Sequence, residues 1–204
     1  MYLWKRLICV NPLIKLGILA SGSGSNAQRL WNYFSSSNAI SVVLVASNRA
    51  SAGVVARAAQ DHVPCLVFEP TPEGFSDLLA QFDEAGVQAV FLAGFLKPLP
   101  AAWIAHYSGK IWNLHPSLLP KFGGAGMYGM HVHRAVVAAG AVETGITLHE
   151  VTEQYDEGPI CFQARVPVLP SDSPESVAEK IHSLEMEFVP VELERLLRAR
   201  FLGA

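Results

Sequence analysis

The chain has 204 residues, of which 50% are hydrophobic and 16% charged, so it can bury a substantial core within one domain. Its formal net charge is −3, and its notable basic grouping lies close to the C-terminus. This balance argues against a nucleic-acid-binding surface and favours small molecules as ligands. The basic grouping consists of Arg195, Arg198 and Arg200.

Two features of the sequence bear on the compartment of the protein. The cysteines are odd in number and lack metal-binding spacing, which predicts a reduced, cytoplasmic protein. They are Cys9, Cys65 and Cys161. No apolar run is long and clean enough to predict a membrane span, because Lys97, Pro98 and Pro100 interrupt the best candidate region.

Residues 1–15 are predicted to form an N-terminal extension, followed by a single domain over residues 16–204. Basic residues precede apolar ones in the extension, as in a signal peptide, but Asn11, Pro12 and Lys15 break the apolar stretch. The small residues at which such a peptide could be cleaved lie inside the glycine-rich loop that follows. We therefore expect an extension of unknown role.

The domain opens with a short apolar strand over residues 16–20, a Gly/Ser loop over residues 21–26 and a helix over residues 27–34. Glycines let the backbone approach a ligand closely, and the first turn of a helix presents unpaired N–H groups to an anion. The pattern predicts a phosphate-binding loop. An ordinary Gly/Ser turn that opens a capped helix is the alternative.

Apolar strands and helical segments then alternate along the chain. This rhythm predicts an α/β fold with a doubly wound, mainly parallel sheet in one domain. The predicted strands cover residues 41–46, 65–68 and 88–93, and the predicted helices cover residues 52–61, 75–85 and 101–106.

A further strand is predicted over residues 109–113, and it runs into the sequence Asn-Leu-His-Pro. Alternation places Asn113 and His115 on one face at the carboxyl end of the sheet, where open α/β folds bind ligands. The amide can orient a carbonyl, the imidazole can stabilise an oxyanion, and the carboxylate of Asp156 can hold that imidazole cationic. These groups predict acyl-type transfer. Strand-end and turn residues that only satisfy backbone groups are the alternative.

Three further histidines lie in or after a glycine-rich stretch that follows the motif. The glycine-rich stretch 121–133 predicts a mobile flap near the site, with a plain surface loop as the alternative. Its His131 and His133 have no neighbouring Cys or acidic ligand, so we predict no metal site there. On a strand predicted over residues 145–151, His149 either supports the site or is a core histidine.

A helix is predicted over residues 173–187, with Ser or Asp as its cap and Pro near its first turn, and the arginines from 195 to 200 are predicted to stand at the C-terminal end of a helix. His182 and Glu185 are three residues apart and therefore share one face of this helix. Taken alone, the two residues indicate a solvated helix face.

The run from Asn113 to Phe122 resembles the signature of the folate-dependent formyltransferases, and four other segments between about residue 15 and the last helix share the similarity. The resemblance implies a formyltransferase-like fold and transfer of a formyl group from 10-formyltetrahydrofolate to the amine of glycinamide ribonucleotide in purine synthesis. It implies no metal and no redox cofactor. The alternatives are a 10-formyltetrahydrofolate hydrolase and a non-catalytic nucleotide-binding module.

The resemblance also implies roles for individual residues. The catalytic residues would be Asn113, His115 and Asp156. The ribonucleotide would bind through its phosphate to Gly24, Ser25 and Asn26, and through other polar groups to His182 and Glu185. The folate would contact Leu96, Lys97, Pro98, Leu99 and Asn113. Lys97 stands where arginine is frequent, and residues 69–81 hold no arginine for the folate glutamyl tail.

Overall fold

The computed structural model describes residues 13–203. Most of the predicted N-terminal extension, with Cys9, lies outside the described residues. The first strand, β1, begins at Ile14, so residues 14 and 15 belong to the sheet rather than to the extension to which the sequence analysis assigned them.

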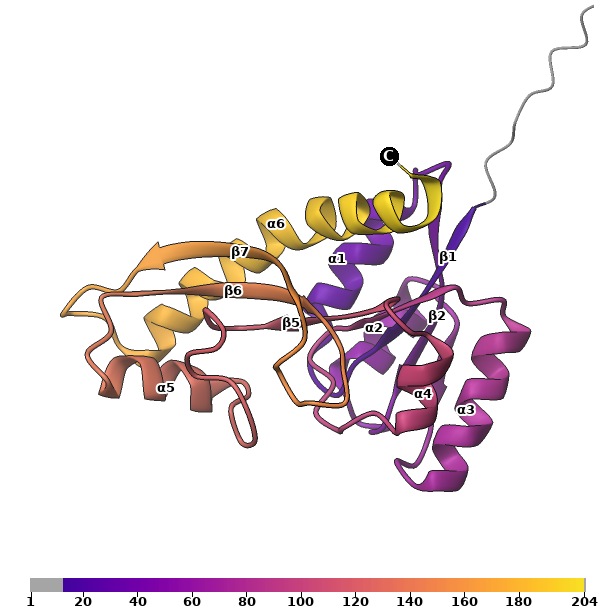
Figure 1. The fold of residues 1–204 in the computed structure, drawn as a ribbon, viewed down its shortest axis with the longest axis horizontal. Coiled ribbons are helices and arrows are strands. Elements are labelled where there is room, and N and C mark those ends of the chain that lie inside the picture. The colour runs from indigo at the N-terminus through magenta and orange to yellow at the C-terminus, as the bar shows by residue number, and fades with distance from the viewer. Residues whose placement is uncertain (1–12, 204) are drawn as a thin grey trace, which may run out of the picture.

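Within the described residues, seven strands form one sheet in the order β3-β2-β1-β4-β5-β6-β7 (Figure 1). Strands β1 to β5 pair in parallel, whereas β6 and β7 continue the sheet in antiparallel pairings. The predicted α/β fold with a mainly parallel, doubly wound sheet is confirmed. The strands are β1 Ile14–Leu19, β2 Ile40–Ser47, β3 Cys65–Val67, β4 Ala89–Leu92, β5 Ile111–His115, β6 Glu143–Glu150 and β7 Ile160–Pro167.

Helices cover both faces of the sheet. Helices α1, α2, α5 and α6 pack on one face, and α3 and α4 pack on the other (Figure 1). They are α1 Ser25–Phe34, α2 Gly53–Gln60, α3 Pro72–Glu84, α4 Ala101–His106, α5 Met130–Ala138 and α6 Pro174–Leu202.

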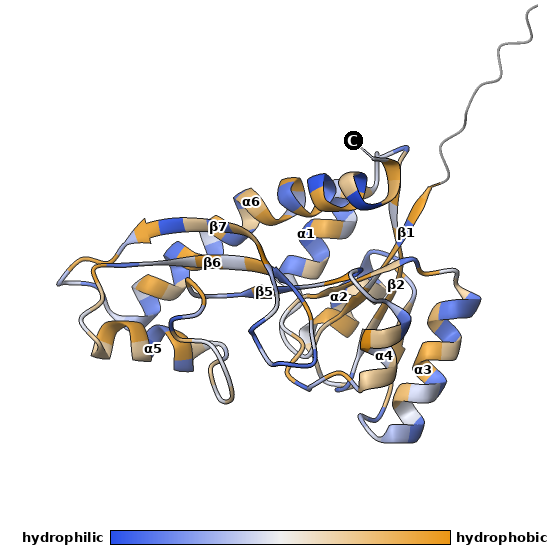
Figure 2. Ribbon diagram, viewed as in Figure 1, coloured by the Kyte–Doolittle hydropathy of each residue, from blue (hydrophilic) through white to orange (hydrophobic). Residues whose placement is uncertain are grey.

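The position of β4 inside the sheet explains why the sequence of this strand is apolar throughout. Ala89 and Phe91 join the core beneath α1 and α6, whereas Val90 and Leu92 join the core beneath α3 and α4. A strand covered on both faces has no solvent-exposed side on which polar residues would be favoured. Figure 2 shows the same logic in the helices, where hydrophobic stripes alternate with hydrophilic ones along α3 and α6.

The order of the strands positions a ligand site. From β1 the chain proceeds outward to β2 and β3, then returns to β4 on the other side of β1 and continues to β5. The loops that follow β1 and β4 therefore diverge, and such a reversal leaves a crevice at the carboxyl ends of the two strands.

Among the predicted boundaries that are wrong, three concern the segments around the site. Strand β5 ends at His115, two residues later than predicted, so Asn113 lies inside the strand. The stretch 121–133 is not wholly a loop, because α5 begins at Met130 and contains His131 and His133. Helix α6 continues from Pro174 past Pro190 to Leu202, because a continuous apolar face packs on the sheet. The predicted helix over residues 173–187 and the predicted helix end at residues 195–200 therefore belong to one helix. No helix within residues 13–203 is long and apolar enough to cross a membrane.

Candidate active site

The Gly/Ser loop after β1 leaves the N-terminus of α1 free to bind a ligand. Gly24 occupies the N-cap in the left-handed region, with φ of 80°, and no side chain caps the helix. A Cβ at this position would lie 2.5 Å from the Cα of Val54, so the loop passes too close to α2 for any side chain there. The uncapped first turn of α1 has the polarity that attracts an anion.

A first cavity of about 320 Å³ lies at the crevice predicted by the strand order. Its walls come from the loops after β1, β4 and β5, from the segment before α5, and from the first half of α6. Every residue predicted for the ribonucleotide lines it, together with the three predicted catalytic residues. These are Gly24, Ser25, Asn26, His182 and Glu185, and Asn113, His115 and Asp156.

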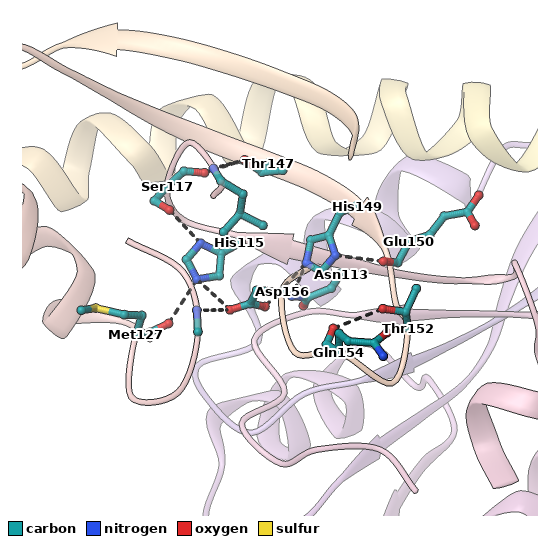
Figure 3. Close-up of polar contacts among 12 residues, drawn as sticks. Asn113, His115, Ser117, Met127, Thr147, His149, Glu150, Thr152, Gln154 and Asp156 are labelled. Carbon is teal, nitrogen blue, oxygen red and sulfur yellow. Dashed lines mark hydrogen bonds and ion pairs between the residues drawn. The ribbon is translucent and has the colours of Figure 1, made fainter. Parts of the chain in front are cut away.

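His115 is buried at the end of β5 with hydrogen-bonding groups around both ring nitrogens (Figure 3). Its Nδ1 lies 3.0 Å from the hydroxyl of Ser117, and its Nε2 lies 3.2 Å from the carbonyl oxygen of Met127. The same Nε2 lies 3.5 Å from Oδ2 of Asp156. The side chains of His115 and Asp156 are each 5% exposed, so their interaction is little screened by solvent.

Asp156 stands in a turn and also faces the two imidazoles of the site. Its backbone has φ of 59°, a left-handed conformation that Asp tolerates better than most residues. Its Oδ2 accepts a hydrogen bond of 2.9 Å from the N–H of Gly124, and its Oδ1 lies 3.7 Å from Nε2 of His149. The carboxylate is therefore fixed between two imidazoles, and the glycine-rich loop helps to orient it.

The pairing of β5 with β6 brings His149 next to Asn113. The two residues are directly opposite each other in the register, and Nδ2 of Asn113 lies 3.0 Å from Nε2 of His149. Nδ1 of His149 lies 3.0 Å from the carbonyl oxygen of Glu150, which identifies Nδ1 as the donor and Nε2 as the acceptor. His149 thus orients the Asn113 amide, so it supports the site although it is also buried.

Burial governs the protonation of these groups. It lowers the pKa of His115, while the charge of Asp156 and the hydrogen bond to Met127 act in the opposite direction. Burial likewise lowers the pKa of His149. Both imidazoles are therefore neutral at pH 7 in the free protein, and His115 can gain a proton when negative charge develops beside it.

On α6, the two residues predicted to bind the ribonucleotide differ in their exposure to solvent. The His182 side chain is 51% exposed, but that of Glu185 is only 13% exposed. Glu185 accepts a hydrogen bond of 2.9 Å from Nδ2 of Asn26, and burial raises the pKa of its carboxyl. The solvated-face interpretation is therefore wrong for Glu185, because α6 packs beside α1 and brings its carboxylate to the phosphate-type loop.

A second cavity adjoins the first. It is lined by Lys97, Pro98 and Leu99, by both apolar and polar residues of the sheet, including His149, and by the loop from Val151 to Asp156. The two cavities share four lining residues, which are Phe95, Asn113, Tyr155 and Asp156. Leu96 lines the first cavity instead, and its N–H is donated to the hydroxyl of Ser21.

Sequence reasoning did not single out Ser117, Met127 or Gly124 as partners of His115 and Asp156. Ser117 had a signal, because it lies two residues after His115 within the same motif. The other two act through backbone groups, which any residue type could supply. In the part of the chain that the structure describes, no cluster of His, Cys, Asp or Glu has the makings of a metal site.

An α/β fold with an uncapped helix N-terminus beside an Asn and a buried His–Asp pair is typical of a class of group-transfer enzymes. A family model described as formyl transferase matches residues 14–193, and the chain belongs to this family. It is therefore a transferase of the formyltransferase fold.

Individual proteins and solved structures of this family are also similar to the chain. The chain is 36% identical over 200 residues to the chloroplastic phosphoribosylglycinamide formyltransferase of Arabidopsis thaliana, covering 91% of this chain and 68% of that protein. It is 35% identical to the trifunctional purine biosynthetic protein adenosine-3 of Drosophila melanogaster, covering 92% of this chain but only 14% of the relative. A crystal structure of glycinamide ribonucleotide transformylase 1 from Geobacillus kaustophilus superposes with a TM-score of 0.83 at 34% identity, covering 91% and 99% of the two chains.

Proposed function

We propose that the protein transfers a formyl group from 10-formyltetrahydrofolate to the amine of glycinamide ribonucleotide, a step of purine synthesis. One observation supports this above all: two cavities built from different segments of the chain meet at Asn113 and Asp156. The first has an anion-binding loop for a phosphorylated acceptor. The second combines apolar residues with the polar loop 152–156, which suits a folate ring that carries both apolar faces and hydrogen-bonding edges. Reacting atoms bound in the two cavities would meet beside the buried polar groups.

The acceptor binds in the first cavity in this proposal. Its phosphate lies at the N-terminus of α1, against Gly24, Ser25 and Asn26, and its ribose hydroxyls face His182 and Glu185. A carboxylate that already accepts from Asn26 has a free oxygen for a hydroxyl. This arrangement leaves the amine of the acceptor directed toward Asn113 and Asp156.

The folate binds in the second cavity. Lys97, Pro98 and Leu99 also line a larger apolar groove of about 700 Å³ between α3 and α4, which continues away from the reacting centre. A pterin ring beside Asn113 and an aryl tail in this groove match the two parts of the cosubstrate. Lys97 is the charged side chain of that groove, which offers one cation to a carboxylate tail.

The reaction begins when the neutral amine attacks the formyl carbon. A C–N bond forms, and the carbonyl electron pair moves to the oxygen, where Asn113 and a protonated His115 donate hydrogen bonds to the oxyanion. The bond to the folate nitrogen then breaks, the attacking nitrogen loses a proton and the leaving nitrogen gains one. Asp156 stabilises the imidazolium and helps to carry the proton through water.

Ser117 can serve His115 in both protonation states. Its hydroxyl lies 3.0 Å from Nδ1 and 2.7 Å from the carbonyl oxygen of Lys121. It donates to Nδ1 while the imidazole is neutral, and it turns to donate to Lys121 and accept from Nδ1–H once the imidazole is cationic. His115 can therefore change charge without losing this hydrogen bond.

The test is the consumption of 10-formyltetrahydrofolate with and without glycinamide ribonucleotide. We expect consumption to require the ribonucleotide and to yield one formylated product per folate used. Equal consumption without the acceptor would identify the hydrolase, and binding without turnover would identify a non-catalytic nucleotide-binding module. The phosphate-type loop disfavours the hydrolase, because water needs no such loop. The cytoplasmic location and the absence of nucleic-acid partners stay predictions.

A further inference from the structure

His133 is a buried histidine in the first cavity that the mechanism above does not use. It lies in the first turn of α5, is 5% exposed, and lines the cavity together with the first turn of α1 and the first half of α6. Its helix neighbour His131 is exposed and packs its ring edge-to-face on Tyr128. Of the two histidines in the glycine-rich stretch, only His133 belongs to the cavity wall.

The imidazole of His133 has no hydrogen-bond partner among residues 13–203. Its Nδ1 is buried and unpaired, and no protein group bonds to its Nε2. Oδ1 of Asn26, which lines the same cavity, is a second buried atom without a partner. Leaving a buried imidazole without any partner is costly, so His133 in the cavity wall indicates a ligand that pairs with one of its nitrogens. The unpaired Oδ1 of Asn26 is an acceptor, so it calls for a donor, such as a hydroxyl, on the same ligand.

The protonation state of the His133 ring determines which kind of ligand atom it can bind. Burial lowers the pKa of His133, so the ring is neutral at pH 7 and carries one N–H. An unpaired N–H is harder to bury than an unpaired acceptor, which favours the proton on Nε2 and leaves a bare lone pair on the enclosed Nδ1. The ring then offers a hydrogen-bond donor to the ligand.

We propose that His133 is a substrate-binding residue that donates its Nε2–H to a phosphate oxygen of the acceptor. The identity of that acceptor as a ribonucleotide rests on the proposed function. Three phosphate oxygens accept more hydrogen bonds than the first turn of α1 can supply, so a donor from α5 completes their coordination. The phosphate is then held from two helices instead of one.

The experiment measures the binding of ribose 5-phosphate, used as the probe, to the full chain and its variants. His133→Phe and His133→Asn should weaken binding about tenfold, since neither places a donor at the Nε2 position, whereas His133→Gln should retain most of it. His131→Asn, on the exposed side of α5, is the matched control and should bind as the wild type does. Methyl riboside, which lacks the phosphate, should bind no differently to any of the variants.

Activity supplies the second readout. His133→Asn should raise the KM for the ribonucleotide about tenfold without changing the KM for the folate. The proposal is overturned if folded His133→Asn binds the probe like the wild type, or if Asn and Gln lose affinity equally, as a packing role predicts. If His133→Phe does not fold, the comparison of His133→Asn with His133→Gln still tests the proposal. A wild-type protein that binds the probe through His133 but formylates nothing would instead overturn the proposed function.

Discussion

At the scale of single residues, the central feature is one carboxylate between two neutral imidazoles. Asp156 lies 3.5 Å from His115 and 3.7 Å from His149, and all three side chains are buried. Burial favours the neutral form of each ring, while the carboxylate favours the cationic form. The site is thus arranged to accept a proton during the reaction instead of holding it beforehand.

Replacing Asp156 by Asn tests this balance. The variant should lower turnover by about 10²–10⁴-fold with little loss of either substrate's affinity, because the interaction matters mainly once charge develops. The pKa of His115 should fall further, since the carboxylate is one of the influences that raise it. Turnover against pH and the NMR titration of His115 measure the two effects. Near-normal turnover with an unchanged titration would reduce Asp156 to a turn residue.

We expect the ionised carboxylate of Glu185 to lower the stability of the folded protein while it strengthens ribonucleotide binding. Burial raises the pKa of its carboxyl, so the folded protein holds this proton more tightly than the unfolded chain does. Stability is therefore lost as the pH rises from the unfolded pKa through the higher folded one. Glu185→Gln should raise the melting temperature at pH 8 more than at pH 4, while weakening ribonucleotide binding about tenfold.

The exposed Glu187 on the same helix provides the control, and its replacement by Gln should change neither property. A gain in melting temperature for Glu185→Gln that is the same at both pH values would show that the ionised carboxylate is not destabilising. Unchanged ribonucleotide affinity would remove Glu185 from the acceptor site.

At the scale of elements, the proposed function assigns acceptor binding to the N-terminus of α1. Gly24→Val should destabilise the protein by about 1–3 kcal/mol, because φ is 80° and the new side chain would meet Val54. It should also weaken ribonucleotide binding strongly and leave folate binding nearly intact. Asn26→Ala should weaken the same contact without the backbone strain.

Gly140→Val is a matched control for Gly24→Val. Gly140 also has a left-handed backbone, with φ of 59°, but a Cβ there meets nothing within 4 Å, and the residue lines neither cavity. The Gly140→Val variant should be less stable than the wild type and should bind the ribonucleotide with unchanged affinity. Calorimetric titration of each substrate measures the outcome, and equal losses for folate and ribonucleotide in Gly24→Val would contradict the assignment of the loop.

At the scale of the whole molecule, the two cavities should bind their ligands at the same time. They share a boundary at Asn113 and Asp156 but have separate walls on the two sides of the crevice. A non-reactive folate analogue and ribose 5-phosphate, each at about 100 times its Kd, should each add about 2.7 kcal/mol of stability. The two gains should be nearly additive in thermal unfolding, and mutual exclusion of the ligands would contradict the arrangement.

The sequence by itself determined the class of fold and predicted most of the residues that the structure brings together at the candidate site. Strand and helix periodicity predicted the sheet, because a strand covered on both faces must be apolar throughout, as β4 is. The motif around His115 and the glycines before α1 could be read locally, since a ligand-binding loop and a strand end each need particular residue types. Boundaries failed where packing overrides local signals, as in α5 and in α6 past Pro190.

Only the tertiary structure decided which side chains meet. The register of β5 and β6 places His149 against Asn113, and a shift of one residue would have turned it to the other face. The packing of α6 beside α1 changes Glu185 from a surface residue to a partner of Asn26. Met127 and Gly124 contribute backbone groups, which leave no mark on side-chain identity. Contacts between distant segments depend on how elements pack, and no local pattern records that.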